Sequence, residues 1–373
     1  MAEKKYPHPA WIEIDSKQFK KNLSIVKTHI GKTLLCLPVK ANAYGHGLCE
    51  IGKEAEKAGV DYLAVAHLGE AMALRQTGIN IPILVLGAIH EDQIEDLIHH
   101  NIEFSLSSKF KADLVAEKCR EKQKQCRVHI EVDTGMQRTG MRYETALALF
   151  SHVQKLPVFS PVGLYSHLAT ADHREDPTAL KQITSFQALV SEPILQDKPL
   201  IKHLANSGGT AFFPTSHFDM VRPSLLCFGY LPPHPPKTLE GIQPCFSLKA
   251  KIAYFKVVEK GEGISYGHSH ITSKQTRIIT IPVGYGDGYS RCLSNKACIL
   301  LRGKRYPIVG KICMDQFMVD IGEDEAFVGE EVVLIGKQGK EEISLKEIAD
   351  LCNTIPYEVL CLFNERIPRV YLE

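Results

Sequence analysis

Apolar residues along the first two thirds of the chain come in short runs, separated by segments with helical spacing. The runs are rich in Leu, Val and Ile, which is typical of strands buried on both faces of a parallel sheet. Between two of them, Ile51, Ala55 and Ala58 recur on one helix face. We expect strands at Leu34–Lys40, Tyr62–Ala66, Ile81–Leu86, Ile102–Leu106, Arg127–Val132, Val162–His167, Lys202–Ala205 and Met220–Phe228. About eight such units predict an α/β barrel of parallel strands, although a doubly wound open sheet has the same alternation.

The pattern differs at the two ends of the chain. Trp11–Asp15 alternates like a half-exposed strand, and Asp15 or Ser16 can cap a helix that follows. After the stiff connector Leu231–Pro236, alternating strands predominate, with one helix. They are expected at Phe246–Val258, Thr276–Val283, Ala297–Val309, Phe317–Ile321 and Glu331–Ile335, with the helix at Ser344–Leu351. We therefore predict a barrel domain at 1–236 and a mostly β domain at 237–373.

Composition narrows the class of protein. The 373 residues carry a net charge of +1, so the chain has no electrostatic footprint for nucleic acid or an anionic membrane. The stretch Met1–Tyr6 is polar and basic, and no stretch approaches the roughly 20 apolar residues of a membrane span. Eleven cysteines without a Cys-x-x-Cys pair favour a reducing cytoplasm over a disulfide framework or a zinc site. We expect a cytoplasmic protein without a metal site.

Polar residues stand at the ends of the predicted barrel strands, where the active sites of such barrels lie. Lys40 ends the first strand, Glu131 and Arg138 accompany the fifth, and His167 closes the sixth. The run Asn206–Gly209 follows the seventh strand, and Arg222 lies in the eighth. A partly desolvated lysine amine can attack a carbonyl. The set therefore suits a cofactor with an aldehyde, a ring nitrogen and a phosphate.

The stretch Val39–Gly47, VKANAYGHG, resembles the pyridoxal-phosphate attachment signature of the alanine racemase family, and the resemblance extends along nearly the whole chain. It implies a (β/α)8 TIM-type barrel of fold type III with a C-terminal β domain. It also implies pyridoxal 5'-phosphate as cofactor, held as a Schiff base by Lys40, with Tyr44 at the phosphate.

Two further motifs carry the resemblance in the barrel. HLANSGG implies phosphate binding by Asn206 and Ser207, and DMVRPSL implies that Arg222 faces the pyridine nitrogen, with His203 orienting it. Because arginine only donates hydrogen bonds, it discourages protonation of that nitrogen. The family usually has Gly-Ile where this chain has Ser224-Leu225, and the backbone N–H of Ser224 can still reach the phosphate.

The β domain supplies a second proton-handling residue by resemblance. GEGISYGHSH contains Tyr266, which in the family is contributed across a homodimer interface, with His167 and Arg222 as assistants. Inversion at Cα needs a base on each face, because a single base returns the proton to the side it came from. The resemblance therefore implies that Lys40 and Tyr266 are the two catalytic bases.

Other positions of the resemblance surround the substrate. Arg138, Met314 and Asp315 correspond to residues that bind or border its carboxylate, and Tyr357 closes the site and reaches the phosphate. The gate of the substrate channel corresponds to Tyr285, Arg291, Asp172 and Ile355. The bulky Tyr266 and Tyr357 leave little room beyond a methyl side chain, which favours alanine.

One departure from the family concerns Glu131. Many members have a carbamylated lysine there that holds the arginine corresponding to Arg138. Glu131 is already a carboxylate, so we expect it to pair with Arg138 directly, with a water or a shifted Arg138 compensating for its shorter side chain.

The function implied is pyridoxal-phosphate-dependent interconversion of L-alanine and D-alanine, which supplies D-alanine for peptidoglycan. One alternative is an amino-acid decarboxylase of the same layout, although Arg222 disagrees with the acidic residue that those enzymes place at the ring nitrogen. Another is a non-catalytic pyridoxal-phosphate carrier, although such carriers are single barrels.

Overall fold

The computed structural model describes residues 8–373, and the chain divides into two compact units. The barrel unit contains residues 18–43 and 48–244. The C-terminal unit contains 245–373 together with the residues up to Lys17 and the short stretch 44–47. The polar stretch Met1–Tyr6 lies outside the described residues.

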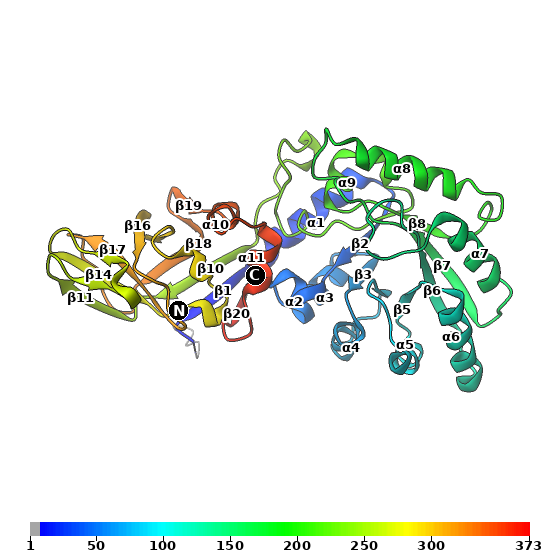
Figure 1. The fold of residues 1–373 in the computed structure, drawn as a ribbon, viewed down its shortest axis with the longest axis horizontal. Helices are drawn as coiled ribbons and strands as arrows, with labels where there is room; N and C mark the ends of the chain where they lie inside the picture. Colours follow the sequence, from blue (N-terminus) through cyan, green and yellow to red (C-terminus); the bar gives the residue numbers. More distant parts are fainter. Residues whose placement is uncertain (1–7) are drawn as a thin grey trace. The chain divides into compact units, whose positions relative to one another are not determined.

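Eight parallel strands close into a barrel in which each strand pairs with the next along the chain and the last pairs with the first (Figure 1). They are β2 (Leu34–Pro38), β3 (Tyr62–Val65), β4 (Ile83–Val85), β5 (Glu103–Leu106), β6 (Cys126–Glu131), β7 (Phe159–Tyr165), β8 (Ile201–His203) and β9 (Met220–Val221). Closure confirms the predicted barrel and excludes the open sheet.

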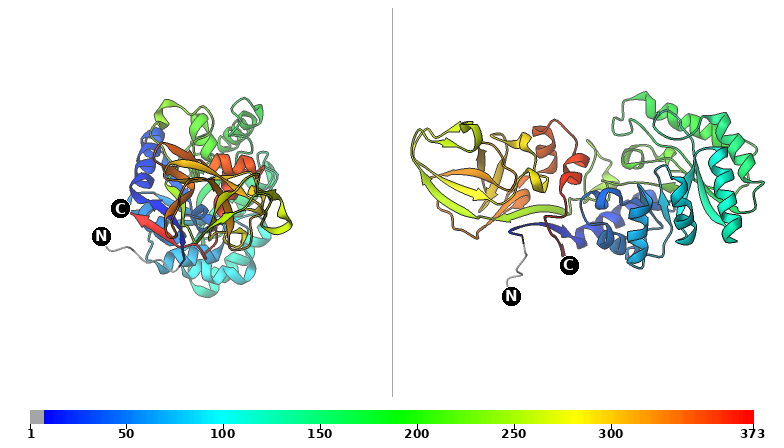
Figure 2. Two further views of the ribbon diagram at one scale, coloured as in Figure 1. Left: turned by 90° about the vertical axis from the view of Figure 1, so that its left-hand side faces the viewer. Right: turned by 60° about the horizontal axis from the view of Figure 1, so that its bottom comes forward.

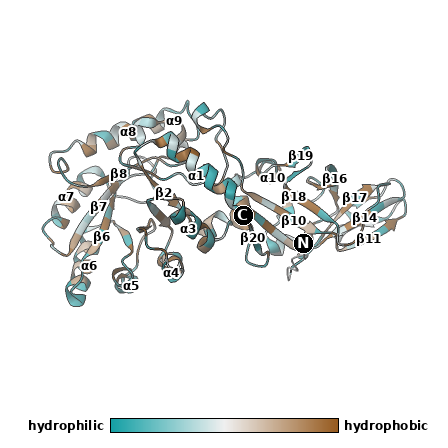
Figure 3. Cartoon of the chain, turned by 180° about the vertical axis from the view of Figure 1, so that it is seen from behind, coloured by the Kyte–Doolittle hydropathy of each residue, from teal (hydrophilic) through white to brown (hydrophobic). Residues whose placement is uncertain are grey.

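Helices follow the strands and surround the barrel (Figure 1). They are α1 (Ser16–Ile30), α2 (Lys40–Tyr44), α3 (Leu48–Lys57), α4 (Leu68–Gln76), α5 (Ile94–His99), α6 (Lys109–Lys122), α7 (Tyr143–Val153), α8 (Pro177–Val190) and α9 (Ser207–Phe212), with 3₁₀ turns η1 (Glu91–Gln93), η2 (Pro214–Ser216) and η3 (Lys237–Leu239). Figure 3 shows hydrophilic and hydrophobic residues on the same helices. In α8, for example, Ile183, Phe186 and Leu189 are buried, so one face of the helix packs inward.

Several strands are shorter than their apolar runs. The run Met220–Phe228 forms only the two-residue strand β9, so Arg222 follows the strand instead of lying within it. Pro223 has no N–H to continue the ladder, and the buried residues after it pack outside the sheet. Likewise β7 ends at Tyr165, and His167 lies in the loop beyond it. The predicted positions of Arg222 and His167 are thus corrected from strand to strand-following loop.

The C-terminal unit is built on one large sheet with the order β11-β14-β17-β16-β15-β18-β10-β1-β20, and β19 pairs with β18. Its strands are β1 (Ala10–Asp15), β10 (Phe246–Lys251), β11 (Tyr254–Val258), β14 (Thr276–Ile281), β15 (Cys298–Leu301), β16 (Lys304–Val309), β17 (Phe317–Gly322), β18 (Glu331–Gln338), β19 (Glu341–Ile343) and β20 (Arg369–Leu372). A separate hairpin joins β12 (Gly263–Ile264) to β13 (His270–Ile271). The helical segments are α10 (Leu345–Leu351), α11 (Pro356–Leu362), η4 (Tyr266–His268), η5 (Tyr285–Asp287) and η6 (Arg291–Leu293). The mostly β character is confirmed, and α11 is a helix that the pattern did not predict.

The unit boundaries differ from the predicted 236/237 division. Strand β1 pairs with β10 and β20, so the blue start of the chain lies among strands from its far end (Figure 2). Residues 237–244, in contrast, stay with the barrel unit. The amide of Asn22 in α1 donates to the carbonyl of Gln243 at 2.8 Å and accepts from its N–H at 3.1 Å. These bonds hold the connector to the barrel beyond the proline-rich stretch.

Residues 8–373 contain neither a membrane-spanning helix nor a cluster of metal ligands. No helix there combines the length and apolar character needed to cross a membrane. No three His, Cys, Asp or Glu side chains of the same residues gather closely enough to hold a metal ion.

Candidate active site

Lys40 begins a turn with an unusual backbone. Ala41, Asn42, Ala43 and Tyr44 all have φ between 52° and 55°, so the segment winds left-handed. Each non-glycine residue in this region costs about 1–2 kcal/mol, and such strain is typical of functional sites. The carboxylate of Glu70 in α4 holds the turn by accepting from the N–H of Ala41 at 2.7 Å.

Arg222 is the most deeply buried cation of the predicted site, with only 3% of its surface exposed. Its Nη1 donates to Nδ1 of His203 at 2.6 Å, and its Nη2 donates to the carbonyl of Ser166 at 2.7 Å. The guanidinium also lies over the ring of Tyr165, 5.2 Å from its centroid. The predicted orientation of Arg222 by His203 is therefore confirmed, and further contacts fix the same side chain.

His167 lies beside Arg222 and is uncharged. Nη2 of Arg222 is 3.3 Å from Nδ1 of His167. Burial and the positive charges of Arg222, Arg138 and Lys40 lower the pKa of His167 to about 3. Because arginine can only donate, Nδ1 accepts and Nε2 carries the proton. Arg222, Arg138 and Lys40 thus lie close enough to His167 for their charges to act on its ring.

A second part of the barrel site joins the loops after β8 and β9. The hydroxyl of Ser207 accepts from the N–H of Ser224 at 2.9 Å, and Asn206 caps α9 by accepting from the N–H of Gly209 at 3.0 Å. A Cβ at Gly208 would lie 2.6 Å from the carboxylate of Asp172, so only glycine permits this approach. The structure thus brings together three of the residues predicted to bind phosphate, with the predicted gate residue Asp172 next to them.

Glu131 and Arg138 are not in direct contact in this structure: Arg138 is exposed, and its charge acts on the pKa of Glu131 without a direct ion pair among the described residues. The buried carboxylate of Glu131 instead accepts from the hydroxyls of Thr139, at 2.8 Å, and Tyr165. Burial raises its pKa, against the lowering effect of these two donors and of the arginine charges. Two neutral hydroxyls therefore satisfy the short side chain.

In the C-terminal unit, Tyr44 and Tyr357 come together although they are far apart in sequence. Their rings meet edge to face with centroids 6.0 Å apart. The glycines around Tyr44 make room for protein: a Cβ at Gly45 would lie 2.4 Å from the carbonyl of Leu360 in α11. Gly45 therefore allows the close packing of α11, which carries Tyr357.

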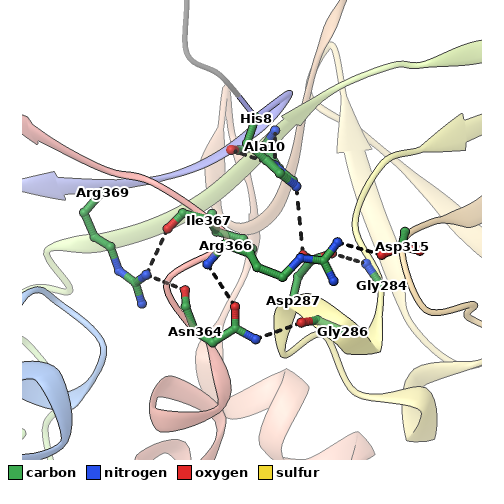
Figure 4. A network of polar contacts seen from close by, with 10 residues as sticks. All are labelled: His8, Ala10, Gly284, Gly286, Asp287, Asp315, Asn364, Arg366, Ile367 and Arg369. Atoms are coloured by element: carbon green, nitrogen blue, oxygen red, sulfur yellow. Dashed lines mark hydrogen bonds and ion pairs between the residues drawn. The ribbon is translucent and has the colours of Figure 1, made fainter.

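The residues predicted to border the substrate carboxylate lie in a loop tied to the gate residue Tyr285. The N–H of Tyr285 donates to the carbonyl of Cys313, and the N–H of Gly286 donates to the carbonyl of Met314. Arg366 fastens the same loop, since its guanidinium lies between Asp315, at 2.6 Å, and the buried Asp287, at 3.3 Å (Figure 4). Met314, Asp315 and Tyr285 thus form one rigid group.

Tyr266 stands beside this loop with its side chain in solvent. The residue is 72% exposed, and Met314 and Ile355 are also more than half exposed. The preceding Ser265 has φ 65°, and its hydroxyl donates to the carbonyl of Lys311 at 2.6 Å. The predicted gate residue Arg291 begins η6, where its carbonyl accepts from Ser294. The unit therefore presents several large apolar groups on its surface, near residues predicted to act in catalysis.

Sequence reasoning missed several residues that hold the site. Glu103 and His129 each interrupt an apolar barrel strand, and a polar residue within a buried run was a signal that could have found them. Glu70 and Arg366 lie in a helix and a loop of ordinary composition. Only the fold shows what these two residues contact.

A closed parallel barrel with these polar groups after its strands, joined to a β unit with exposed tyrosines, defines the class of two-domain barrel racemases. Residues 14–232 match the family model of the alanine racemase N-terminal domain, and residues 245–371 match that of the C-terminal domain. The chain belongs to the alanine racemase family.

Similar proteins cover the whole chain. The alanine racemase of Desulfovibrio desulfuricans is 39% identical over 371 residues, which are 99% of each chain. A solved alanine racemase from Clostridium difficile 630 has a TM-score of 0.93 and 35% identity, covering 99% of this chain and 97% of its own. A histidine racemase from Leuconostoc mesenteroides superposes with a TM-score of 0.92 at 29% identity, over 100% of both chains.

Proposed function

We propose that this protein interconverts L-alanine and D-alanine with pyridoxal 5'-phosphate as cofactor. The observation that carries the proposal is the group around Arg222: a buried cation that donates toward the site, a neutral His167 and the strand-following Lys40. The family membership and the full-length similarity to alanine racemases support the same activity.

The donor set of the barrel unit fits this cofactor. Lys40 is the residue to hold its aldehyde carbon, and Arg222 is the donor to its ring nitrogen. Ser207 offers its hydroxyl for the phosphate, and the N–H of Ser224, which donates to that hydroxyl in this structure, lies beside it. We also propose that Tyr44 and Tyr357 reach the phosphate. When bound, pyridoxal phosphate withdraws electrons from Cα of the attached amino acid and makes its proton acidic.

Proton transfer at Cα then falls to two side chains. Lys40 Nζ takes or gives the proton on one face, and the hydroxyl of Tyr266 from a second copy of the chain serves the other. The exposure of Tyr266 supports this assignment, because a side chain in solvent is available to a neighbouring subunit. The neutral His167 carries a proton on Nε2. It can therefore donate a hydrogen bond to the phenol oxygen of Tyr266 without adding positive charge. The active form is therefore a homodimer.

Residues from both units are the carboxylate-facing and gate groups of this proposal. We propose that Met314, Asp315 and Arg138 position the substrate carboxylate, and that Tyr285, Arg291, Asp172 and Ile355 line the channel. The histidine racemase with the same fold shows that the fold itself accommodates different amino acids. Selectivity for alanine therefore depends on the bulk of Tyr266 and Tyr357. The proposed role is supply of D-alanine for peptidoglycan in the cytoplasm.

The test is a racemisation assay with alanine, serine, histidine and lysine, with and without added pyridoxal phosphate. We expect alanine to react fastest and Lys40→Ala to lose both turnover and the cofactor absorbance near the visible edge. The control is Lys32→Ala, which removes an exposed lysine from the same unit. Release of carbon dioxide indicates a decarboxylase, and absence of Cα deuterium exchange indicates a carrier. Retained turnover and absorbance in Lys40→Ala contradict the proposal.

A further inference from the structure

A line of buried polar side chains connects Arg222, after β9, to the carboxylate of Glu103 in β5, across the three strands between them. Nδ1 of His203 accepts from Arg222, and Nε2 of His203 lies 3.0 Å from Nδ1 of His129. Nε2 of His129 lies 2.8 Å from Oε2 of Glu103. Both histidines are 0% exposed and Glu103 is 2% exposed. The four side chains come from β5, β6, β8 and the residue after β9, and we call them the relay.

The chemistry of the two ends fixes every proton in the relay. Arg222 has no acceptor, so Nδ1 of His203 must be unprotonated and Nε2 must carry the proton. That N–H donates to Nδ1 of His129, whose own proton therefore lies on Nε2 and is donated to Glu103. A charged imidazole, or a protonated Glu103, would place two donors face to face somewhere along the line. Only two neutral rings and an ionised carboxylate satisfy all three contacts.

The relay depends on a gap in the intervening strand. Strand β7 lies between β6 and β8, and its Gly163 pairs with His129 on one side and Ile201 on the other. A Cβ at Gly163 would lie 2.0 Å from Nδ1 of His129. Any side chain at this position therefore collides with the ring that reaches toward His203. The sequence provides the only residue that leaves this path open.

The far end of the relay is anchored. Nε of Arg127 donates to Oε1 of Glu103 at 2.6 Å, so the two carboxylate oxygens have separate partners. Next to Arg222, the ring of His203 stacks on Tyr165 with centroids 4.8 Å apart. Arg127 thus stabilises the charge of Glu103, and Tyr165 fixes the plane of the His203 ring.

From these contacts we propose that Glu103, His129 and His203 form a one-directional hydrogen-bond relay, made possible by Gly163, that holds the Arg222 guanidinium in a single orientation. Glu103 and His129 are then positioning residues for the reaction, and the inference rests on the proposed function for its kinetic consequence. The relay does not conduct protons. Moving a proton from Nε2 to Nδ1 on either ring would bring two N–H donors face to face. The relay takes the place of a carboxylate in direct contact with the guanidinium of Arg222. Such a contact would weaken the hydrogen bonds that Arg222 donates into the site.

The most direct test locates the protons without using turnover. Neutron diffraction from deuterium-exchanged crystals of the unmodified protein is expected to show deuterons on Nε2 of both His129 and His203, and none on their Nδ1 atoms or on Glu103. A deuteron on either Nδ1, a doubly deuterated ring or a protonated Glu103 overturns the relay. This result stands whether or not the protein racemises alanine, so it separates failure of the relay from failure of the proposed function.

A substitution tests the consequence. Gly163→Ala keeps every charge but blocks the His129–His203 contact, and we expect kcat for alanine to fall about tenfold with KM unchanged. ¹⁵N spectra of histidine-labelled protein should show that Nδ1 of His129 no longer accepts a hydrogen bond, while Arg222 still holds the tautomer of His203. The control is Ser105→Ala, in the same strand as Glu103 and bonded to Tyr165 outside the relay, which should leave the Nδ1 signal of His129 unchanged.

Unchanged kcat in Gly163→Ala, with the contact broken in its crystal structure, overturns the proposal. If that variant does not fold, Glu103→Gln takes its place, because its neutral side chain fills the same space. We expect Glu103→Gln to lower kcat several-fold while pyridoxal phosphate still binds, and an unchanged kcat again contradicts the relay.

Discussion

The two units treat their predicted site residues in opposite ways. In the barrel unit Arg222 is buried, and hydrogen bonds to His203, the Ser166 carbonyl and His167 fix its position. In the C-terminal unit Tyr266 stands in solvent, and only its backbone neighbours are fixed, through Ser265. The difference teaches that the barrel unit fixes its own predicted site residues by contacts within that unit. The C-terminal unit carries its predicted site residues on its surface, held through backbone hydrogen bonds of the loops that bear them.

The first prediction concerns the exposed Tyr266 of the C-terminal unit. Tyr266→Phe removes the hydroxyl and leaves the fold intact, so we expect racemisation to fall by about 10³-fold, the range of a lost acid–base group. In deuterated water, Lys40 alone should still exchange the Cα proton of one enantiomer without inverting it. The measurement is polarimetry combined with mass spectrometry. Tyr254→Phe, another exposed tyrosine of the same unit, is the control, and equal loss in both variants contradicts the role of Tyr266.

The second prediction concerns what keeps the exposed surface rigid. Arg366→Ala removes the cation between Asp315 and Asp287, so the loop that carries Met314 loses its fastening. We expect KM for alanine to rise about tenfold with a smaller change in kcat, because the loop is proposed to position the carboxylate. Arg302→Ala, which breaks a surface pair with Glu330 in the same unit, should change neither value. Steady-state kinetics of both variants make the comparison.

The third prediction concerns how the stability of the fold depends on pH through the buried histidines of the barrel unit. Burial lowers the pKa of His167 to about 3 and that of His203 well below 6.5, with the neighbouring cations adding to the effect. Below pH 6.5 the unfolded chain therefore binds more protons than the folded one, and acidification destabilises the fold. Each histidine contributes up to about 1.4 kcal/mol per pH unit.

The measurement is urea unfolding at pH 7 and pH 5.5. Glu131 and Asp172, whose pKa values burial raises, act in the opposite direction, but His217, whose pKa burial lowers, adds to the effect of the two histidines. We expect lower stability at pH 5.5, with a smaller loss in His203→Gln than in the unmodified protein. Equal stability at both pH values would mean that these rings are not held neutral.

The smallest expected effect concerns the left-handed turn at Lys40. Ala41 is exposed with φ 52°, so Ala41→Gly relieves backbone strain without losing packing, and we expect stabilisation of about 0.5–1 kcal/mol. The control is Ala188→Gly in the last turn of α8, also exposed, which should destabilise the fold. Denaturant titration measures both. Destabilisation by Ala41→Gly would mean that the turn is not strained.

The barrel and the order of its strands could be predicted from sequence because parallel strands are continuous apolar runs bounded by polar residues. The same pattern placed Ser207 after a strand, and it placed Lys40 and His167 in strands that end two residues before them. The end of β9 could not be predicted, since the apolar run continues past Pro223 into packing outside the sheet. Strand β1 was assigned to the wrong unit because alternation shows a strand but not its partners.

The details of the site depend on contacts that sequence does not encode locally. The expected pair of Glu131 with Arg138 fails because Thr139, one residue from Arg138, offers a hydroxyl at 2.8 Å. The partners of Glu103 lie in strands that are distant along the chain, so their line appears only when the barrel closes. Resemblance to a family identified the roles of residues, and the fold identified what holds them.

The central claim is that Lys40 of one subunit and Tyr266 of another act on the same Cα atom. The direct measurement uses heterodimers of Lys40→Ala and Tyr266→Phe subunits, isolated with two different affinity tags and assayed for alanine racemisation. One site of each heterodimer then combines an intact lysine with an intact tyrosine, and we predict about half the activity of the unmodified dimer. Heterodimers no more active than either variant alone would contradict the account.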